Sequence, residues 1–437
     1  MRGSMLKGLM AMFIGFISFS LSAQVVINEF MAANSSAVND PDFDDSADWV
    51  ELYNTSASAV DLTGYYLTDN LSDTTKWMFP AGTSIAGNGF LLIWADAVNI
   101  GIHTSFKLSS IGEEIGLYDA GLNLLDGFVY SVQETDLSYG RQNDGAEVWA
   151  WFSESTPGAS NNVATPYDGI TFYQPFFSQE GGFFDVQQSV AISALGGEIH
   201  YTLDGRIPTE SDPIYTTPIV FDSNTFLRAR IFVEGFIPGP PVTHSYFFEP
   251  TFEDRQLPVV SLVTDPDYFW DPEIGIYVQD FKPEWEHDLN IEFFENDGNN
   301  QSVFNQRAGV KVNGLWSWQL PQKMLGIYFR NEYGGDLDYP IFADRVRPSY
   351  DEFILRASGS DWANTLFRDG IGQDLVQENA PMYKQGFRPC IVFINGEYLG
   401  IHNMRSRSSD QEIEYMYGVV PNSFDIIAND GEIEEGS

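Results

Sequence analysis

Short apolar runs that alternate with polar residues fill the chain from residue 25 to about residue 160, and turn-forming residues separate them. A repeat of two residues puts successive side chains on opposite faces of a strand, whereas helical periodicity is almost absent from this stretch. Strands patterned in this way bury their apolar faces when two sheets pack together. We therefore predict a β-sandwich, with strands at residues 25–30, 49–53, 64–67, 90–94, 114–118 and 125–130.

A chain of 437 residues is too long for one ordinary hydrophobic core. At about 150 residues per domain, its length suggests roughly three domains. The chain has a single cysteine, Cys390, which excludes an intrachain disulfide and a cysteine-based zinc site. Because Ile391, Val392 and Phe393 follow it, we expect Cys390 to be a buried structural thiol.

The charge of the chain is strongly unbalanced, with 62 acidic residues against 22 basic ones and a net charge of −40. Such a field repels phosphate backbones and anionic lipid headgroups. We therefore expect no nucleic-acid partner. The simplest interpretation of the charge is solubility in an external medium.

The first 23 residues have the organisation of a secretory signal peptide. Arg2 and Lys7 precede an apolar run at residues 9–21, and small residues then lead to Ala23 and polar Gln24. The run is too short to span a bilayer comfortably, and no later segment approaches that length. We expect residues 1–23 to be removed, leaving a secreted or cell-surface protein without a transmembrane segment.

Five motifs mark the first module, residues 25–162. They are INEFMAAN at 27–34, DWVELYN at 48–54, VDLTGYYLTD at 60–69, WMFP at 77–80 and STPGASN at 155–161. On these motifs the module closely resembles a lamin-tail domain. The resemblance implies an immunoglobulin-like sandwich that is used for binding, and it brings no catalytic residues.

An acidic loop within this module raises the question of calcium binding. Hard oxygen ligands at this density could hold Ca²⁺, but the spacing lacks the glycine and the closing glutamate of a twelve-residue calcium loop. We therefore favour a solvated loop over a calcium site. The residues concerned are Asn39, Asp40, Asp42, Asp44, Asp45 and Asp48.

A second β-rich module follows at residues 165–250. Its segment IHYTLDGRIPTESDPIYTTPI contains Asp204-Gly205, a dipeptide that favours a tight hairpin. The segment closely resembles the small C-terminal sandwich of chitobiase and hexosaminidase enzymes, although Arg206 stands where that pattern has Ser or Thr. Its aromatic residues either stack on sugar rings or fill the core, and we expect the second; they are Tyr201, Tyr215 and Phe226.

Mixed α and β patterns begin in the third module, residues 251–437. LPVVSLVTD and GVKVNG read as strands, and residues 361–378 place Phe367, Ile371 and Leu375 at helical spacing. Asn395-Gly396 joins two apolar runs and predicts a hairpin. Ser409 and Glu412 form a capping box for a helix that turns Ile413, Met416 and Tyr417 inward and ends at Gly418.

Five segments of this module carry a further resemblance. They are AGVKVNGLWSWQLPQKMLGIYFRNEYG at 308–334, YPIFAD at 339–344, EFILRASGSDW at 352–362, FRDGIGQDL at 367–375 and VFINGEYLGIHNMR at 392–405. In order and spacing they resemble the first part of a CotH (spore coat protein H) kinase. The resemblance implies that Lys323 binds nucleotide phosphates, and Asp369 is a candidate partner for that lysine. It also implies ATP and Mg²⁺ as cofactors of a complete domain.

Two departures from that pattern bear on activity. Members of the family read Arg-Glu after the hairpin, where this chain has Arg405-Ser406. The catalytic aspartate and a later D-x-D metal segment are expected beyond Ser437, so only the N-terminal portion of the kinase domain is expected here. Phosphoryl transfer needs such groups to orient the acceptor and to hold Mg²⁺.

Other chemistries lack support in the sequence. Paired carboxylates on a barrel scaffold, as a glycosidase needs, are absent. No zinc-hydrolase pair occurs among the five scattered histidines, which are His103, His200, His244, His287 and His402.

The whole chain is thus predicted to be multidomain and mainly β, with two immunoglobulin-like β-sandwiches followed by an incomplete α+β domain that resembles an atypical kinase. Two functions remain open. One is an exported CotH-like protein that phosphorylates Ser or Thr of surface proteins when complete. The other is a non-catalytic adhesion, matrix or carbohydrate-associated surface protein whose kinase-like module is a scaffold. Its partners are expected to be surface proteins or polysaccharide.

Overall fold

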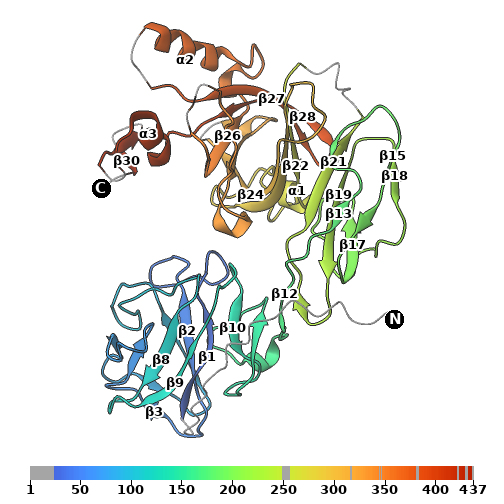
Figure 1. The fold of residues 1–437 in the computed structure, drawn as a ribbon. Coiled ribbons are helices and arrows are strands. Elements are labelled where there is room, and N and C mark those ends of the chain that lie inside the picture. The colour runs from blue at the N-terminus through green and yellow to red at the C-terminus, as the bar shows by residue number, and fades with distance from the viewer. Residues whose placement is uncertain are drawn as a thin grey trace. The chain divides into compact units, whose positions relative to one another are not determined.

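The computed structural model describes residues 24–248, 256–314, 317–343, 345, 347–379, 383–420, 423–428 and 432–435 (Figure 1). The predicted signal peptide, residues 1–23, lies outside this range. The chain divides into two compact units. One contains the residues up to Ile170 together with Gly235–Ile237, and the other contains Thr171–Glu234 and the residues from Pro238 onward.

Two sheets form the first unit and enclose one core. Val25, Ile27 and Phe30 from one sheet share this core with Leu67 and Leu117 from the other. The larger sheet has the order β11 (Trp149–Phe152), β10 (Ser138–Arg141), β1 (Val25–Met31), β2 (Trp49–Asn54) and β7 (Phe90–Trp94). The smaller has the order β5 (Trp77–Met78), β4 (Tyr66–Thr68), β8 (Glu114–Tyr118) and β9 (Leu124–Val129). Two short pairs join β3 (Val60–Asp61) to β6 (Ser84–Ile85) and β12 (Gly169–Ile170) to β20 (Phe236–Ile237). All six strands predicted from alternation are therefore confirmed.

The last motif of the first module is tied to the first two by buried hydrogen bonds. Glu29 accepts bonds from Ser138 Oγ at 2.5 Å and Thr156 Oγ1 at 2.7 Å. Glu51 accepts one from the backbone N–H of Gly158 at 2.6 Å, and Asn161 Oδ1 accepts one from Asn28 Nδ2 at 3.0 Å. These bonds hold the STPGASN segment against β1 and β2, because a buried carboxylate needs its donors.

A small sandwich opens the second unit. Its main sheet has the order β14 (Gly182–Phe183), β21 (Val242–Phe247), β19 (Thr225–Phe232) and β17 (Glu198–Thr202). Two pairs accompany it, β13 (Phe176–Phe177) with β16 (Ile192–Ser193) and β15 (Gln188–Val190) with β18 (Ile219–Phe221). Leu227 and Ile231 of β19 pack in one core with Val190 of β15 and Phe221 of β18.

The tight hairpin predicted at Asp204-Gly205 is wrong. Tyr201 N–H donates to the carbonyl of Pro213, so the paired segments are separated by a long loop, and β17 pairs with β19. Gly205 does adopt the expected positive φ, at 95°. A Cβ at this position would lie 2.1 Å from the carbonyl oxygen of Thr264. The glycine is therefore needed because the backbone at Thr264 comes so close, and it does not close a two-residue turn.

A closed barrel of seven strands follows. Its order is β22 (Val259–Val263), β23 (His287–Phe294), β24 (Phe304–Asn313), β25 (Met324–Tyr328), β26 (Glu352–Arg356), β28 (Glu397–Arg405) and β27 (Phe387–Ile394), and β27 pairs in parallel with β22. Both segments predicted as strands belong to it. Cys390 lies fully buried in the barrel core, as predicted, and burial raises the pKa of its thiol to about 12.

The sandwich and the barrel of the second unit share an aromatic cluster. Phe183 and Phe247 from the sandwich pack with Phe294 and Phe393 from the barrel. Beside them, Glu292 of β23 accepts a 2.7 Å hydrogen bond from the backbone N–H of Ser245. The sandwich and the barrel therefore keep separate cores and meet in this third apolar cluster.

Three helices and a hairpin complete the second unit: α1 (Asp267–Trp270), α2 (Arg368–Asn379), α3 (Asp410–Tyr417) and the pair β29 (Ile426–Ala428) and β30 (Glu432–Glu435). The helix predicted at residues 361–378 begins at Arg368, so Phe367 precedes it. Phe367 is 48% exposed and Ile371 is 45% exposed, so the predicted apolar face is not buried. Ser409 caps α3 as predicted, and Gly418 ends it, but Tyr417 is exposed. Across the described residues, no helix is both long enough and apolar enough to cross a membrane.

Candidate functional site

Lys323, the predicted nucleotide lysine, lies at the start of β25 and lines a cavity of about 600 Å³. Only 7% of the residue is exposed. Its ammonium group lies over three aromatic rings, 5.4 Å from the centre of Tyr277, 5.7 Å from Phe281 and 5.9 Å from Trp318. It also donates a hydrogen bond to the carbonyl oxygen of Trp318. The cavity is thus lined by this buried cation together with two aromatic residues, Tyr277 and Trp318, and five further uncharged residues.

Gln322, the residue before this lysine, anchors the strand that carries it. Its side-chain amide donates to the carbonyl of Ile401 at 2.7 Å and accepts a bond from Trp362 Nε1 at 2.7 Å. His402 Nε2 lies 3.2 Å from the carbonyl oxygen of Lys323. Burial lowers the pKa of His402 to about 4, so its ring is neutral at pH 7 and Nε2–H donates this bond. Gln322 and Lys323 are therefore held in place by hydrogen bonds from β28 and from the loop after β26.

The electrostatic environment of Lys323 favours an anionic ligand. Burial lowers the pKa of its ammonium below the ordinary value, because the charged form loses water. Among the described residues, no carboxylate pairs with the ammonium, which meets only aromatic rings and a carbonyl. A phosphate in the cavity would supply the missing counter-charge. The remaining lining residues, all uncharged, are Val278, Gln279, Gln319, Leu320 and Pro321.

Asp369, the proposed partner of that lysine, is engaged elsewhere. It lies in the first turn of α2, and its Oδ2 accepts a 2.5 Å ion-paired hydrogen bond from Arg405 on β28. The same oxygen lies 3.2 Å from Arg356 on β26. The structure therefore does not bring Lys323 and Asp369 together, and Asp369 fastens α2 to the barrel.

Sequence reasoning missed a buried charge cluster next to the hairpin. Glu412 is fully buried and forms ion pairs with Arg345 at 3.1 Å and Arg347 at 3.4 Å. Ser406, which replaces the family's glutamate, donates a 2.8 Å hydrogen bond to the same carboxylate. Glu412 had been expected only to cap α3, and the spacing of 65 residues between it and Arg347 carries no sequence signal.

Of the aromatic residues considered for sugar binding, two pack against the core of the small sandwich, and the third, Phe226, lies beside Gly396 of the barrel hairpin. Phe226 is 8% exposed, and Tyr201 and Tyr215 pack against the core. Their ring faces are consequently used within the protein, as expected from the size of the sandwich.

Comparison with protein families identifies three regions. Residues 20–132 match the Lamin Tail Domain, residues 179–243 the Chitobiase/beta-hexosaminidase C-terminal domain, and residues 310–432 the CotH kinase protein family. The CotH match begins within β24, so β22 and β23 of the barrel precede it. No curated protein matches the chain. Lys323 and the lining residues 318–321 thus lie in the matched kinase segment, whereas Tyr277, Val278 and Gln279 of the same cavity precede it. The chain combines a lamin tail domain, a chitobiase/β-hexosaminidase C-terminal domain and a CotH kinase region.

Proposed function

We propose that the CotH kinase region binds a nucleoside triphosphate in the cavity beside Lys323. The observation that carries this proposal is a buried lysine, without a carboxylate partner among the described residues, inside an aromatic cavity of about 600 Å³. Lysine binds phosphate as a point charge. Trp318, which lines the cavity, offers an aromatic ring on which a purine base can stack, a contact worth about 1–3 kcal/mol for nucleic-acid bases.

Phosphoryl transfer to a Ser or Thr hydroxyl requires groups that the described lining of this cavity does not contain. In kinases, carboxylates hold Mg²⁺ against the triphosphate and a further group orients the acceptor. The described lining contains no carboxylate, so these residues do not fit a Mg²⁺ site and we assign no transfer step to them. Of the two candidate functions, a nucleotide-binding scaffold is the one that the composition of the cavity favours, and protein Ser/Thr kinase activity is the second.

The setting that we propose is outside the cytoplasm, in the secreted or cell-surface fraction. The signal-peptide pattern of residues 1–23 and the net charge of −40 support it. The two sandwiches would bind surface proteins, because two of the aromatic residues considered for polysaccharide binding, Tyr201 and Tyr215, pack against the sandwich core, and Phe226 is buried. Mass spectrometry of the surface and secreted fractions should find an N-terminal peptide that begins near Gln24. Intact residues 1–23 in the cytosolic fraction would contradict this setting.

Nucleotide binding can be tested with matched lysine variants of the full chain. Isothermal titration with ATP, with and without Mg²⁺, should show binding that Lys323→Met weakens at least about tenfold, because the phosphate loses its only cation in the cavity. Lys311→Met is the control, since Lys311 on β24 pairs with Glu286 at 3.0 Å and does not line the cavity. Equal affinity of the Lys323→Met variant and the unmodified protein, or no binding at all, would contradict the proposal.

A radiolabel assay separates the two candidate functions. If the region is a scaffold, protein that binds ATP should incorporate no γ-phosphate into itself or into surface proteins. Incorporation that is lost in Lys323→Met would favour the kinase.

A further inference from the structure

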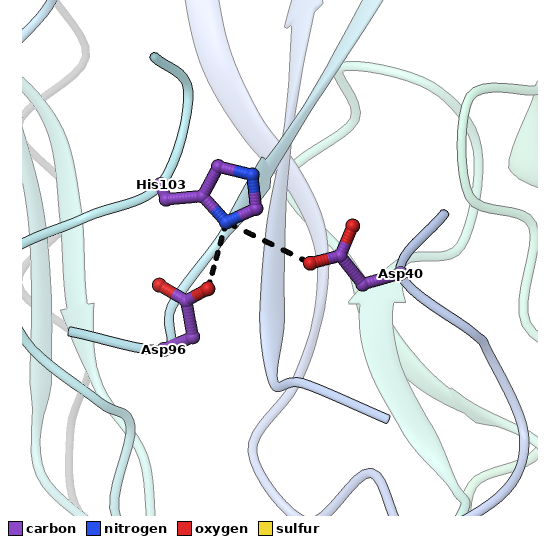
Figure 2. Close-up of side chains that lie close together, drawn as sticks. All are labelled: Asp40, Asp96 and His103. Carbon is purple, nitrogen blue, oxygen red and sulfur yellow. Dashed lines mark hydrogen bonds and ion pairs between the residues drawn. The ribbon is translucent and has the colours of Figure 1, made fainter. Parts of the chain in front are cut away.

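A histidine and two aspartates converge at one point in the first unit (Figure 2). Asp40 lies in the acidic loop after β1, Asp96 lies two residues after the end of β7, and His103 lies in the loop that follows. His103 Nδ1 lies 2.7 Å from Asp96 Oδ2 and 3.7 Å from Asp40 Oδ2. His103 is 3% exposed and Asp40 is fully buried. The acidic loop and a segment more than fifty residues later thus place one nitrogen and two oxygens within 4.8 Å of one another.

The other polar atoms of these three side chains are already engaged. Asp40 Oδ1 accepts a hydrogen bond from the backbone N–H of Asp42 at 2.9 Å, and Asp96 Oδ1 accepts one from that of Val98 at 3.0 Å. His103 Nε2 lies 3.3 Å from the carboxylate of Asp42. Metal-binding histidines commonly donate their second ring N–H to a carboxylate in this way, which orients the ring. The outer contacts therefore aim Asp40 Oδ2, Asp96 Oδ2 and His103 Nδ1 inward.

One of the inward atoms lacks a hydrogen bond. Asp40 Oδ2 is buried and has no hydrogen-bond partner among the described residues. Leaving a buried polar atom unpaired is unfavourable, and more so for a charged group. The atom faces His103 (Figure 2), so the space between these ligands is where a cation would relieve that cost.

We propose that Asp40, Asp96 and His103 bind one Zn²⁺ ion. Zn²⁺ takes imidazole nitrogen and carboxylate oxygen at about 2.0–2.2 Å, which places tetrahedral ligand atoms about 3.3 Å apart. The two measured separations from Nδ1, 2.7 Å and 3.7 Å, lie on either side of that value. Ca²⁺ prefers about 6–8 oxygen ligands, so a nitrogen among three ligands disfavours it. Three protein ligands leave a fourth position for water or an external group.

In the proposed zinc site, only one carboxylate of the acidic loop binds the metal, unlike in a calcium loop, where several do. Of its carboxylates, Asp40 ligates and Asp42 orients His103, whereas Asp44 and Asp45 are exposed. Asp48 instead accepts a hydrogen bond from the backbone N–H of Asn34 at 3.0 Å. Bound Zn²⁺ would therefore clamp the loop to the segment after β7.

Zinc affinity of the full chain tests the proposal. After treatment with EDTA, a competition titration against a chromogenic zinc chelator should show one Zn²⁺ per chain. Asp40→Asn and His103→Gln should weaken binding more than about 100-fold, and Asp42→Asn about tenfold, since loss of an outer-shell partner typically costs about 10–100-fold. Asp45→Asn is the control, because it removes an exposed carboxylate of the same loop and should leave affinity unchanged.

Two further measurements keep the outcome independent of folding. Asp40→Asn removes the charge of a buried carboxylate whose Oδ2 has no hydrogen bond, and its side-chain oxygen can still accept the bond from the backbone N–H of Asp42. The metal-free variant should therefore melt no lower than the metal-free unmodified protein, while zinc should raise the melting temperature of the unmodified protein alone. Co²⁺ should give the intense visible absorption of a four-coordinate site, which His103→Gln abolishes. Absence of zinc binding, unchanged affinity in either ligand variant, or tighter binding of Ca²⁺ that survives His103→Gln would overturn the proposal.

Discussion

Glu51 is a buried carboxyl group of the first unit whose ionisation depends on its surroundings. Burial raises its pKa to about 8, and the charge of Glu29 adds to the shift, while hydrogen bonds from Asn28 and Gly158 oppose it. The folded protein therefore holds a proton on Glu51 at pH values where the unfolded chain has lost it. Folding stability must then fall as pH rises from about 4.5 to about 8.

Replacing this group should change the pH dependence of stability. In the unmodified protein, Glu51 should make the free energy of unfolding fall by up to about 1.4 kcal/mol per pH unit between pH 5 and 8. In Glu51→Gln this contribution should be absent, so the stability of the variant relative to the unmodified protein should increase as pH rises. Hydrogen exchange of peptides from β1 and β2 along a urea series at several pH values measures this. Glu154→Gln, which removes an exposed carboxylate of the same unit, is the control. Parallel slopes for the unmodified protein and Glu51→Gln would refute this assignment.

Motifs predicted the module that contains Glu51 but not the burial of its side chain. The pairing of β1 with β2 changes register between Ile27 and Glu29, which breaks the two-residue alternation on which a sequence prediction depends. Glu29 and Glu51 then lie opposite each other and are both fully buried. Apart from Asn28, which donates to Glu51, the donors to these carboxyl groups come from residues 138–158, about a hundred positions later in the sequence. No local sequence pattern predicts these bonds.

At the scale of elements, local turn chemistry predicted the hairpin between β27 and β28 correctly. Asn395 and Gly396 both have positive φ, at 48° and 75°, as a two-residue loop of this kind requires. The face of α2 was predicted less well, because helical spacing does not tell whether a neighbour exists to cover it. That helix contacts the barrel through Asp369 and through Gly370, where a Cβ would lie 2.5 Å from the ring of Phe387.

The same substitution at two glycines should have opposite effects. Gly396→Ala forces a Cβ into the left-handed region and should lower the free energy of unfolding by about 1–2 kcal/mol. Gly372→Ala, inside α2 where a Cβ meets nothing within 4 Å, should raise it by about 0.5–1 kcal/mol. Chemical denaturation of both variants checks this pair. A stabilised Gly396→Ala variant would contradict the hairpin geometry.

At the scale of the molecule, the small sandwich and the barrel should unfold together, because Phe247 packs into aromatic residues of both. Its ring centre lies 5.1 Å from that of Phe183 and 4.7 Å from that of Phe393. Phe247→Ala should cost about 3–5 kcal/mol. Hydrogen exchange should then rise in peptides of β19 and of β22 alike. Phe172→Ala, at a side chain that is 72% exposed, is the control, and loss of protection confined to the sandwich would show that the two are independent.

The sequence predicted only part of the candidate site around Lys323. A motif identified Lys323 but not the aromatic rings that surround its ammonium. Tyr277 and Phe281 reach the same ammonium from more than forty residues away, because the chain between β22 and β23 folds over the barrel end. Nonlocal packing of this kind depends on the closed topology, which the α+β prediction did not contain.

Photolabelling with an azido derivative of ATP tests the central claim most directly, because it reports where the base lies. We predict that the label attaches to peptides containing Tyr277–Gln279 or Trp318–Pro321, that unlabelled ATP competes for it, and that Lys323→Met removes it while Lys311→Met does not. Labelling elsewhere on the chain, or undiminished labelling of the Lys323→Met variant, would contradict a nucleotide site in this cavity.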